Sequence, residues 1–294
     1  MPLRSLVVAG VSLGAAFCYA ASNVIEQRKA AEAPPESSMK VSLLWHLAHE
    51  PVWWLGIGVD VGGFALQVTA LGLGSLVFVQ PLLVTSLVFS LALGAAVGSH
   101  HLSRSDIAWA LVLMMALSSF LLMASAEGGD DQRPFRAWIV PLAALGAIVA
   151  MCAALARRSR GPAKAALLAA AAGITFGVSS TLMKSFAHLL GAHGIGAVVT
   201  HWEPWALALV VPVGFLFVQS AFQAGDLRAA LPALEVAEPI VASLLGVLLM
   251  REHVDVGSNL AKVSLVATAA VMAWAAIALA RSAADTRAQV PVTG

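Results

Sequence analysis

The sequence predicts an all-α integral membrane protein with about nine transmembrane helices, arranged as two inverted repeats. Three observations lead to this fold class. The chain of 294 residues is 60% hydrophobic and only 11% charged, whereas soluble domains average about 25% charged residues. About nine apolar runs are long enough to cross a bilayer, which takes about 20 residues of helix. Similar segments also recur in the same order in the two halves of the chain.

The apolar runs are predicted to be helices because backbone N–H and C=O groups must find partners inside the chain when they lie in lipid. The runs lie near 5–26, 51–72, 75–98, 106–125, 136–156, 163–189, 204–224, 228–250 and 259–281. The longest connection is "RKAAEAPPESSMKVSLLWHLAHE", which begins polar and proline-rich and then becomes amphipathic.

These runs divide the chain into four parts. The first half-repeat, with spans one to four, covers 1–126. Residues 127–162 hold the connecting fifth span and a basic cytoplasmic loop. The second half-repeat, with spans six to nine, covers 163–282, and residues 283–294 are expected to form a disordered tail.

The repeat rests on two weak similarities. The segment "AGVSLGAAFCYAAS" resembles "AGITFGVSSTLMKS", and a second pair of segments aligns after an insertion. The matched positions are Gly10 with Gly173, Gly14 with Gly177, Gln67 with Gln219, and Pro81 with Pro239. Equivalent spans are five apart, an odd number, so the two halves must be inverted in the membrane. Inverted repeats are typical of secondary transporters, whose substrate site lies near the midplane between the halves.

Glycines spaced four apart recur in three of the spans. They are Gly10 and Gly14, Gly58 and Gly62, and Gly173 and Gly177. This spacing of small residues allows close helix crossing, so we interpret all three pairs as packing positions.

The basic residues of the loops predict the orientation of the protein. Most Lys and Arg residues lie on the side that holds the odd-numbered loops and the C-terminal tail, and the cluster "RRSRGPAK" contributes most of this bias. Because cytoplasmic loops are enriched in Lys and Arg, we expect a multi-pass protein of the plasma (inner) membrane. Its N-terminus would lie outside and its C-terminus in the cytoplasm.

Four ionisable residues within the spans are candidate substrate or ion ligands: Asp60, Lys184, Glu235 and Glu238. Each costs at least about 2.5–3.5 kcal/mol to insert, so such residues usually face a cavity or a partner. Three residues apart, Glu235 and Glu238 share one helical face, which suits a proton relay or a cation site. Alternatively, one glutamate pairs with Lys184 and only joins helices, or Lys184 extends its side chain to the interface.

Uncharged polar residues extend the candidate site, although in membrane bundles such residues often only hydrogen-bond between helices. They are Tyr19, Asn23, Gln67, Gln80, Thr85, Ser179, Ser180, Thr181 and Gln219. Pro81 and Pro239 lie inside spans, where each frees a carbonyl one turn back. Because the two prolines occupy the same place in both halves, we expect them at a central cavity.

Other chemistry is not expected. No nucleophile–base pair and no metal-ligand spacing is visible, so we expect neither an enzyme nor a cofactor, and no metal site is identified. The net charge of +1 gives no basic excess for nucleic acid. Cys18 and Cys152 lie in apolar runs, where cysteines usually act as small packing residues.

The segment "FQAGDLRAALPALEVAEPIVASLLGVLLMREHV" resembles the end of a domain of the drug/metabolite transporter superfamily, the EamA-like proteins. The matching positions are Ala221-Phe222, Glu238-Pro239 and Glu252, and the first half repeats the pattern with Gln80-Pro81. Gly94 stands where the closing Glu of the first half would be. Typical members have ten spans, and both their termini lie inside, whereas nine spans with the termini on opposite sides are expected here.

Nine spans with an outer N-terminus are instead similar to the NIPA-like magnesium-transporter branch. There an acidic residue in a "GE-x-x-N-F"-like segment precedes the proline of the first half, and Asp60 in "GVDVGGF" is comparable. Gly63 replaces the Asn of that pattern.

These resemblances imply a secondary transporter that moves small solutes or metabolites across the bacterial inner membrane by alternating access, with proton coupling as an option. The runner-up is a divalent-cation (Mg²⁺) transporter of the NIPA-like type. A lipid or lipid-linked carrier and a non-transporting membrane scaffold are further alternatives. The expected partners are the small-molecule or ion substrate and the lipid bilayer, and a homodimer is compatible with the sequence.

Overall fold

A computed structural model gives the arrangement of the chain. It describes residues 2–98, 102–124, 126–127, 133–194, 196, 200–225, 227–251, 253–254 and 259–289. Within these residues, 9 helices are long and apolar enough to cross a membrane. The predicted all-α class, the number of spans and the multi-pass character are therefore confirmed.

The first four spans come from five helices, because the third span is divided. These helices are α1 (Pro2–Glu32), α3 (Pro51–Leu73), α4 (Leu76–Leu83), α5 (Ser86–Ala96) and α6 (Arg104–Met123). The remaining spans are α7 (Phe135–Arg158), α8 (Gly161–His193), α10 (Glu203–Ala224), α11 (Leu227–Leu248) and α12 (Asn259–Gln289).

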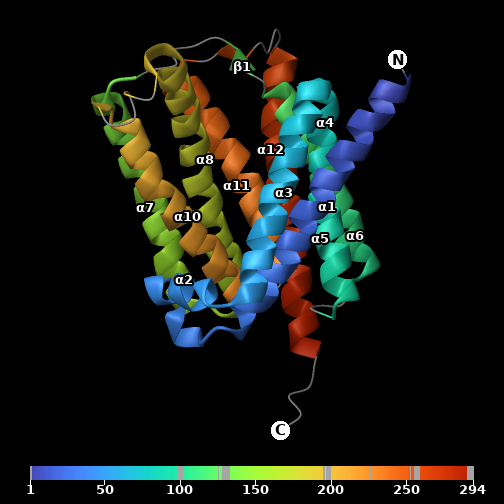
Figure 1. Ribbon diagram of the computed structural model, residues 1–294. Coiled ribbons are helices and arrows are strands. Elements are labelled where there is room, and N and C mark those ends of the chain that lie inside the picture. The colour runs from blue at the N-terminus through green and yellow to red at the C-terminus, as the bar shows by residue number, and fades with distance from the viewer. Residues whose placement is uncertain are drawn as a thin grey trace.

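Short elements connect the spans at the two ends of the bundle (Figure 1). A 3-10 turn, η1 (Pro35–Ser37), and a helix, α2 (Val41–Ala48), form the long first connection. At the other end, β1 (Ala126–Glu127) pairs antiparallel with β2 (His253–Val254) and joins the loops before α7 and α12.

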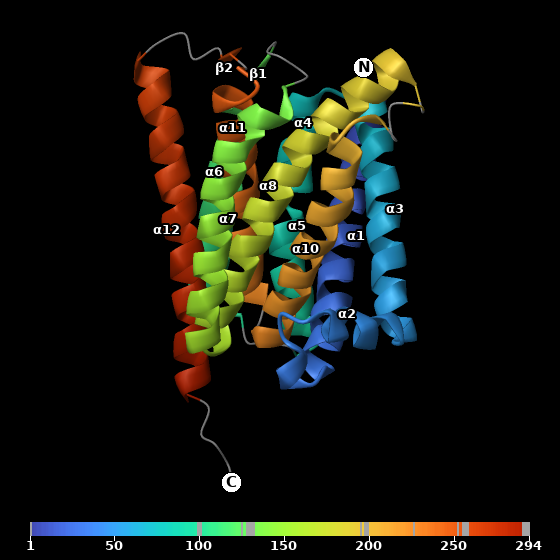
Figure 2. The ribbon, with the colours of Figure 1, turned by 90° about the vertical axis from the view of Figure 1, so that its left-hand side faces the viewer.

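The helices are packed in a repeated order. In the first half, α1 packs along α3 and α5, and in the second half, α8 packs along α10 and α11. Contacts between the halves run from α6 to α12 and from α1 to α10, while α7 packs on α8. Figures 1 and 2 show the bundle of these helices in two views.

Two helices extend beyond their predicted ends. The first helix was expected to end near residue 26 but continues to Glu32, because Glu26 and Gln27 find polar partners inside the protein and Ala30 is fully buried. The expected disordered tail from 283 is wrong for its first residues, since α12 continues to Gln289 and Ala283 is fully buried. Residues 290–294 lie outside the described residues.

The third span consists of two helices that meet at Val84 and Thr85. The first, α4, ends at Leu83, and α5 begins at Ser86, but both linking residues keep right-handed helical dihedral angles. The carbonyl oxygen of Leu82 accepts from the Thr85 N–H, three residues later, and from the Thr85 hydroxyl at 2.6 Å. The chain therefore passes from α4 to α5 through one tightened helical turn.

Glycines let α8 and α11 approach closely. A Cβ at Gly173 would lie 2.7 Å from the carbonyl oxygen of Leu234, and one at Gly177 would lie 2.7 Å from that of Glu238. The packing interpretation of this glycine pair is therefore confirmed.

The packing interpretation is wrong for the other two pairs. A Cβ at Gly10, Gly58 or Gly62 would meet nothing within 4 Å, and one at Gly14 would make only an ordinary contact of 3.7 Å. The crossing of α1 and α3 uses other glycines, since a Cβ at Gly56 would lie 3.1 Å from Glu26 and one at Gly63 would lie 3.1 Å from Cys18. The spacing alone does not say which side of a helix faces its neighbour.

These contacts predict a stability difference between two Gly→Ala variants. Gly177→Ala is expected to lower the free energy of unfolding by about 1–3 kcal/mol, the usual cost of overpacking. In Gly58→Ala the methyl group meets open space, and alanine is the better helix former by about 1 kcal/mol, so no loss is expected. The melting temperatures of both variants in detergent would test this prediction, and equal melting temperatures would contradict it.

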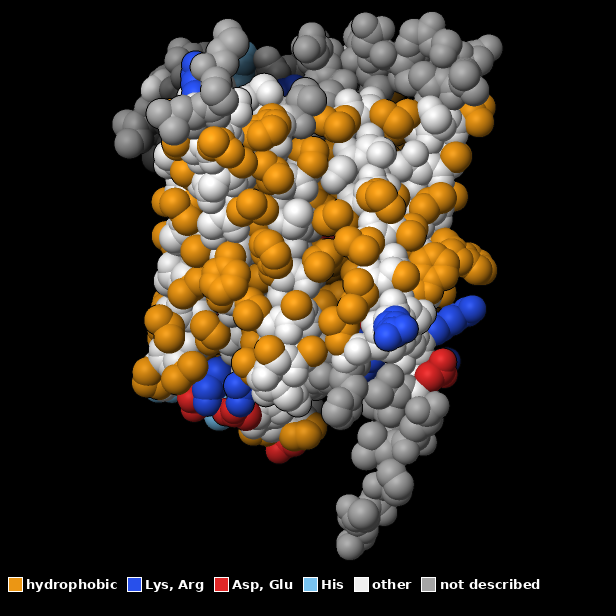
Figure 3. All heavy atoms as spheres, turned by 90° about the vertical axis from the view of Figure 1, so that its right-hand side faces the viewer, with side chains coloured by type: hydrophobic (Ala, Val, Ile, Leu, Met, Phe, Trp, Pro, Cys, Tyr) orange, Lys and Arg blue, Asp and Glu red, His pale blue; other side chains and the backbone are white. Residues whose placement is uncertain are grey.

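The outer surface matches a lipid environment. Large apolar side chains are exposed along the flanks, among them Val140, Leu209, Leu248, Val266 and Trp274. Figure 3 shows hydrophobic side chains over most of one flank, with charged side chains gathered at its lower edge.

The two ends of the bundle differ in their basic residues. We call the end where α1 finishes and α8 begins the basic end, because it holds most of them. Its residues are Arg28, Lys29, Lys40, Arg104, Arg157, Arg158, Arg160, Lys164, Arg228 and Arg281. The start of α1 and the end of α12 lie at opposite ends of the bundle (Figure 1).

Candidate functional site

A cavity of about 580 Å³ lies within the bundle, lined by residues of α1, α3, α4, α5, α6 and α11. The two halves of the chain both contribute to it. Of the polar and proline residues singled out in the sequence, the cavity brings together Tyr19, Asn23, Asp60, Gln67, Gln80, Glu235, Glu238 and Pro239. Residues that lie far apart in the sequence thus share one site.

The cavity carries three carboxyl groups. Asp60 comes from α3, and Glu235 and Glu238 come from successive turns of α11. No Lys, Arg or His is among the described residues that line the cavity. When these acids are ionised, the cavity has a negative potential that attracts cations.

Helix α8 fixes the position of one of these acids. The Ser180 hydroxyl donates to Oε1 of Glu238 at 3.2 Å. Gly173 and Gly177 bring the backbone of α8 against the same part of α11. The predicted polar residue Ser180 therefore acts through Glu238 and does not line the cavity itself.

Pro239 adds a backbone acceptor at this level. Proline has no N–H, so the carbonyl oxygen of Glu235, four residues earlier, has no helical donor. Helix α11 nevertheless stays continuous through Pro239. The helix thus lacks its usual donor to the carbonyl oxygen of Glu235, next to the two carboxylates.

Uncharged polar groups of α1 and α3 also line the cavity. The Tyr19 hydroxyl donates to Oε1 of Gln67 at 2.5 Å and so connects α1 with α3. Asn23 donates through Nδ2 to Oγ of Ser90 at 3.4 Å. The close approach of Tyr19 depends on Gly63, since a Cβ there would lie 3.2 Å from the tyrosine ring.

The junction of α4 and α5 lies at the cavity. Gln80, Leu83, Val84 and Ser86, which lie at or beside this junction, all line it.

The remaining candidates from the sequence that the structure describes do not line the cavity, and three of them, Thr85, Ser179 and Thr181, donate to backbone carbonyl oxygens of their own spans. Gln219 is fully buried and donates through Nε2 to Oε2 of Glu26. Lys184 is exposed on α8 and does not line the cavity, and Pro81 is half-buried in α4 beside Gln80. Glu252 lies outside the described residues. The sequence pairing of Gln67 with Gln219 therefore does not give the two amides equivalent places.

Two features in and around the cavity are not evident from the sequence. Glu26 was taken as the end of the first span, yet it is buried and accepts hydrogen bonds from Ser22 and Gln219. The second is the apolar wall of Leu117 and Leu121 from α6. Nothing in the pattern of α6 distinguishes these two leucines from its other apolar residues.

Comparison with known proteins gives one informative match. The chain is 33% identical over 245 residues to an uncharacterized protein of Corynebacterium glutamicum, Cgl0250/cg0304, and the match covers 83% of this chain and 85% of that protein. The chain belongs to the same family as that protein. No protein-family model and no solved structure matches the chain. The name of the relative states no activity, so the function is argued from the cavity.

Proposed function

We propose that this protein is a secondary transporter of small cationic solutes, which it moves across the membrane by alternating access. The observation that carries the proposal is the cavity, with three carboxyl groups and no basic residue among the described residues that line it. Acidic side chains within membrane spans would be costly in lipid without such a role.

The composition of the lining favours an organic cation. Ligand cavities of about 300–1,000 Å³ suit drug-sized molecules, and this one measures about 580 Å³. The carboxylates of Glu235 and Glu238 would bind an amine. Gln80 would bind other polar groups of the solute, and Leu117 and Leu121 would contact its carbon skeleton. A proton that replaces the cation on a glutamate would provide coupling.

The helix packing supports two inverted halves. The order of contacts of α1 with α3 and α5 corresponds to that of α8 with α10 and α11. In addition, α1 and α8 run in opposite directions along the bundle (Figure 1). Inverted halves are a feature of transporters that rock one half against the other. By the excess of Lys and Arg, the basic end would face the cytoplasm of a plasma membrane.

A hydrated divalent cation such as Mg²⁺ is the second candidate. Three carboxylates attract such an ion, yet no three His, Cys, Asp or Glu side chains within the described residues are placed to hold one metal directly. Mg²⁺ usually keeps several waters in proteins, and the cavity has room for a hydrated ion. The ion would then contact Asp60, Glu235 and Glu238 through water.

Flux in proteoliposomes tests the proposal. Purified protein would be reconstituted, and uptake of cationic, neutral and anionic amino acids and amines would be compared, with dyes that report internal pH and Mg²⁺. Saturable uptake confined to cationic organic solutes is the expected result. Mg²⁺ uptake without organic uptake would favour the second candidate, and the absence of both would contradict transport of cations.

A further inference from the structure

A second pocket, which we call the basic pocket, lies at the basic end and is separate from the cavity. Its volume is about 380 Å³, and it lies where α1 and α7 end, α8 begins and α10 ends. Arg157, Arg160 and Lys164 line it together with Ser159 and Gln223. No Asp or Glu is among the described residues of this lining.

The three cations of the basic pocket have no acidic partner in the described part of the chain. Arg157, Arg160 and Lys164 make no ion pair or side-chain hydrogen bond there. Lys29, at the same end of the bundle, does have acidic partners: its Nζ lies 2.6 Å from Oε2 of Glu32 and 3.7 Å from Oε2 of Glu50. The start of α8 adds the partial positive charge of a helix N-terminus. The basic pocket therefore has a positive charge that nothing described in the protein neutralises.

The basic pocket adjoins the contacts that hold three helix ends together. Gln223 of α10 donates through Nε2 to the carbonyl oxygen of Pro34 at 2.8 Å and to Oγ of Ser37 at 3.1 Å. The carbonyl oxygen of Gly225 accepts from Nε2 of Gln27 at 3.2 Å. Gly225 also packs on α8, since a Cβ there would lie 2.7 Å from that of Ala165.

We propose that the basic pocket binds a phosphate-bearing anion, from a phospholipid headgroup or from a soluble phosphate compound. Arginine recognises phosphate oxygens with two parallel hydrogen bonds, and lysine adds a point charge. Basic pockets between membrane helices at the cytoplasmic side are suited to anionic headgroups. A bound anion would connect Arg157 of α7 with Arg160 and Lys164 at the start of α8. The proposal does not depend on transport, because it concerns a different pocket.

Thermal stability of the purified full chain in a neutral detergent tests the proposal. The probes are pyrophosphate, short-chain phosphatidylglycerol and, for comparison, short-chain phosphatidylcholine, whose phosphate is balanced by a cation. The test variant is Arg157→Gln/Arg160→Gln/Lys164→Gln. The matched control, Arg28→Gln/Arg104→Gln/Arg158→Gln, also removes three charges from the basic end, but none of its residues lines the basic pocket.

The wild type and the control variant are expected to melt at a higher temperature with an anionic phosphate probe, and the test variant is not. Because hydrogen bonds to charged groups contribute strongly to the binding free energy, the loss of each cation should lower the affinity for the anion by about tenfold or more. A response to pyrophosphate supports a soluble ligand, and a response to phosphatidylglycerol alone supports a lipid. Equal responses of the test and control variants, or no response of the wild type, would overturn the proposal.

A milder variant keeps the test decisive if the triple variant does not fold. Lys164→Gln removes one charge from a half-buried side chain and is expected to lower the affinity by about tenfold. Its melting temperature without ligand should equal that of the wild type. An unchanged affinity in this folded variant would also contradict the proposal.

Discussion

Uptake of a cationic solute is expected to fall by about 10- to 100-fold in Glu238→Gln, and further in the double variant Glu235→Gln/Glu238→Gln. Each variant loses a charge-assisted contact of about 1.5–3 kcal/mol with the solute, and about 1.4 kcal/mol corresponds to a factor of ten. Glutamine has nearly the same shape as glutamate and can still accept the hydrogen bond from Ser180. The fold should therefore be preserved.

The matched control for this experiment is Glu36→Gln. Glu36 is an exposed acid of η1 that does not line the cavity, so uptake should equal that of the wild type. Initial rates in proteoliposomes, corrected for the amount of inserted protein, give the comparison. If Glu238→Gln and Glu36→Gln transport equally well, the acids of α11 are structural and the site assignment is wrong.

The variant Asp106→Leu is expected to lower the free energy of unfolding by about 3–5 kcal/mol, the usual effect of breaking a buried ion pair. Asp106 is fully buried, and Arg228 is 2% exposed. Nη1 of Arg228 lies 3.3 Å from Oδ2 of Asp106. Loss of the carboxylate would leave the buried guanidinium without this partner.

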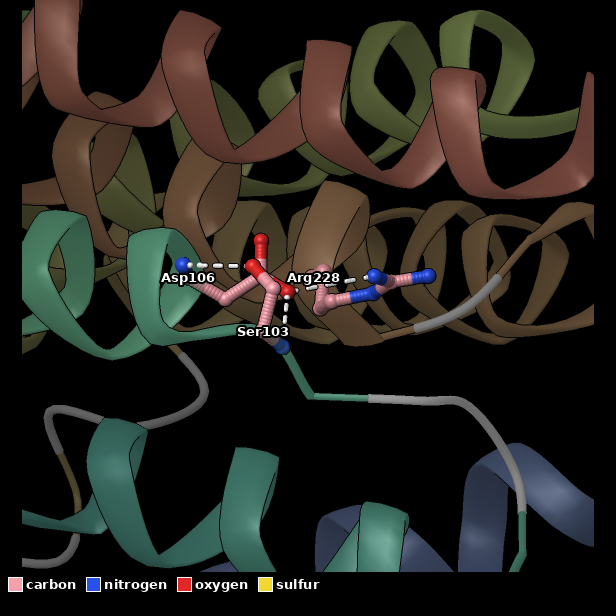
Figure 4. Close-up of polar contacts among 3 residues, drawn as sticks. All are labelled: Ser103, Asp106 and Arg228. Atoms are coloured by element: carbon pink, nitrogen blue, oxygen red, sulfur yellow. Dashed lines mark hydrogen bonds and ion pairs between the residues drawn. The ribbon is translucent and has the colours of Figure 1, made fainter. Parts of the chain in front are cut away.

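The same carboxylate also caps a helix. Ser103 and Asp106 form a capping box at the start of α6, in which the Ser103 side chain accepts from the Asp106 N–H and the carboxylate accepts from the Ser103 N–H (Figure 4). Asp106 thus joins the start of α6 in the first half to the start of α11 in the second half. Asp106→Leu keeps the N-cap Ser103 but removes the acceptor of the Ser103 N–H, a hydrogen bond worth a further ~1 kcal/mol.

A second variant separates the ion pair from the cap. In Ser103→Ala the ion pair remains, so only the smaller cost of the cap is expected. In Asp106→Leu/Arg228→Met no unpaired charge is left by the pair, and replacement of a buried pair by apolar residues is often nearly neutral. The double variant should therefore melt at a higher temperature than Asp106→Leu. A double variant that is less stable than Asp106→Leu would show that Arg228 has a further role of its own.

Most of the fold follows from the sequence because every span must meet the same requirements of the bilayer, a long apolar segment with internal backbone hydrogen bonds. Length and hydropathy place the spans, since each needs about 20 apolar residues. The predicted ends of two helices are wrong. Helix α1 continues past residue 26 and α12 past residue 283, where Ala30 and Ala283 are buried. Hydropathy does not report such packing contacts.

The acidic character of the cavity, but not its geometry, follows from the sequence. Intramembrane acids are costly, and this cost alone identifies Asp60, Glu235 and Glu238 as candidates. Their convergence with Tyr19 and Gln80 on one cavity is a property of the packing. The same cost of insertion also made Lys184 a candidate, but Lys184 is exposed on α8 and does not line the cavity.

The sequence by itself determined the membrane class, the number of spans and the acidic residues of the site, because these depend on local composition. Only the tertiary structure decided which glycines lie at helix crossings, where Gln219 and Glu26 meet, and which cations surround the basic pocket. These depend on the rotation of each helix about its own axis. In a helix that is apolar on every side, the sequence contains little information about that rotation, and contacts between side chains of distant segments fix it.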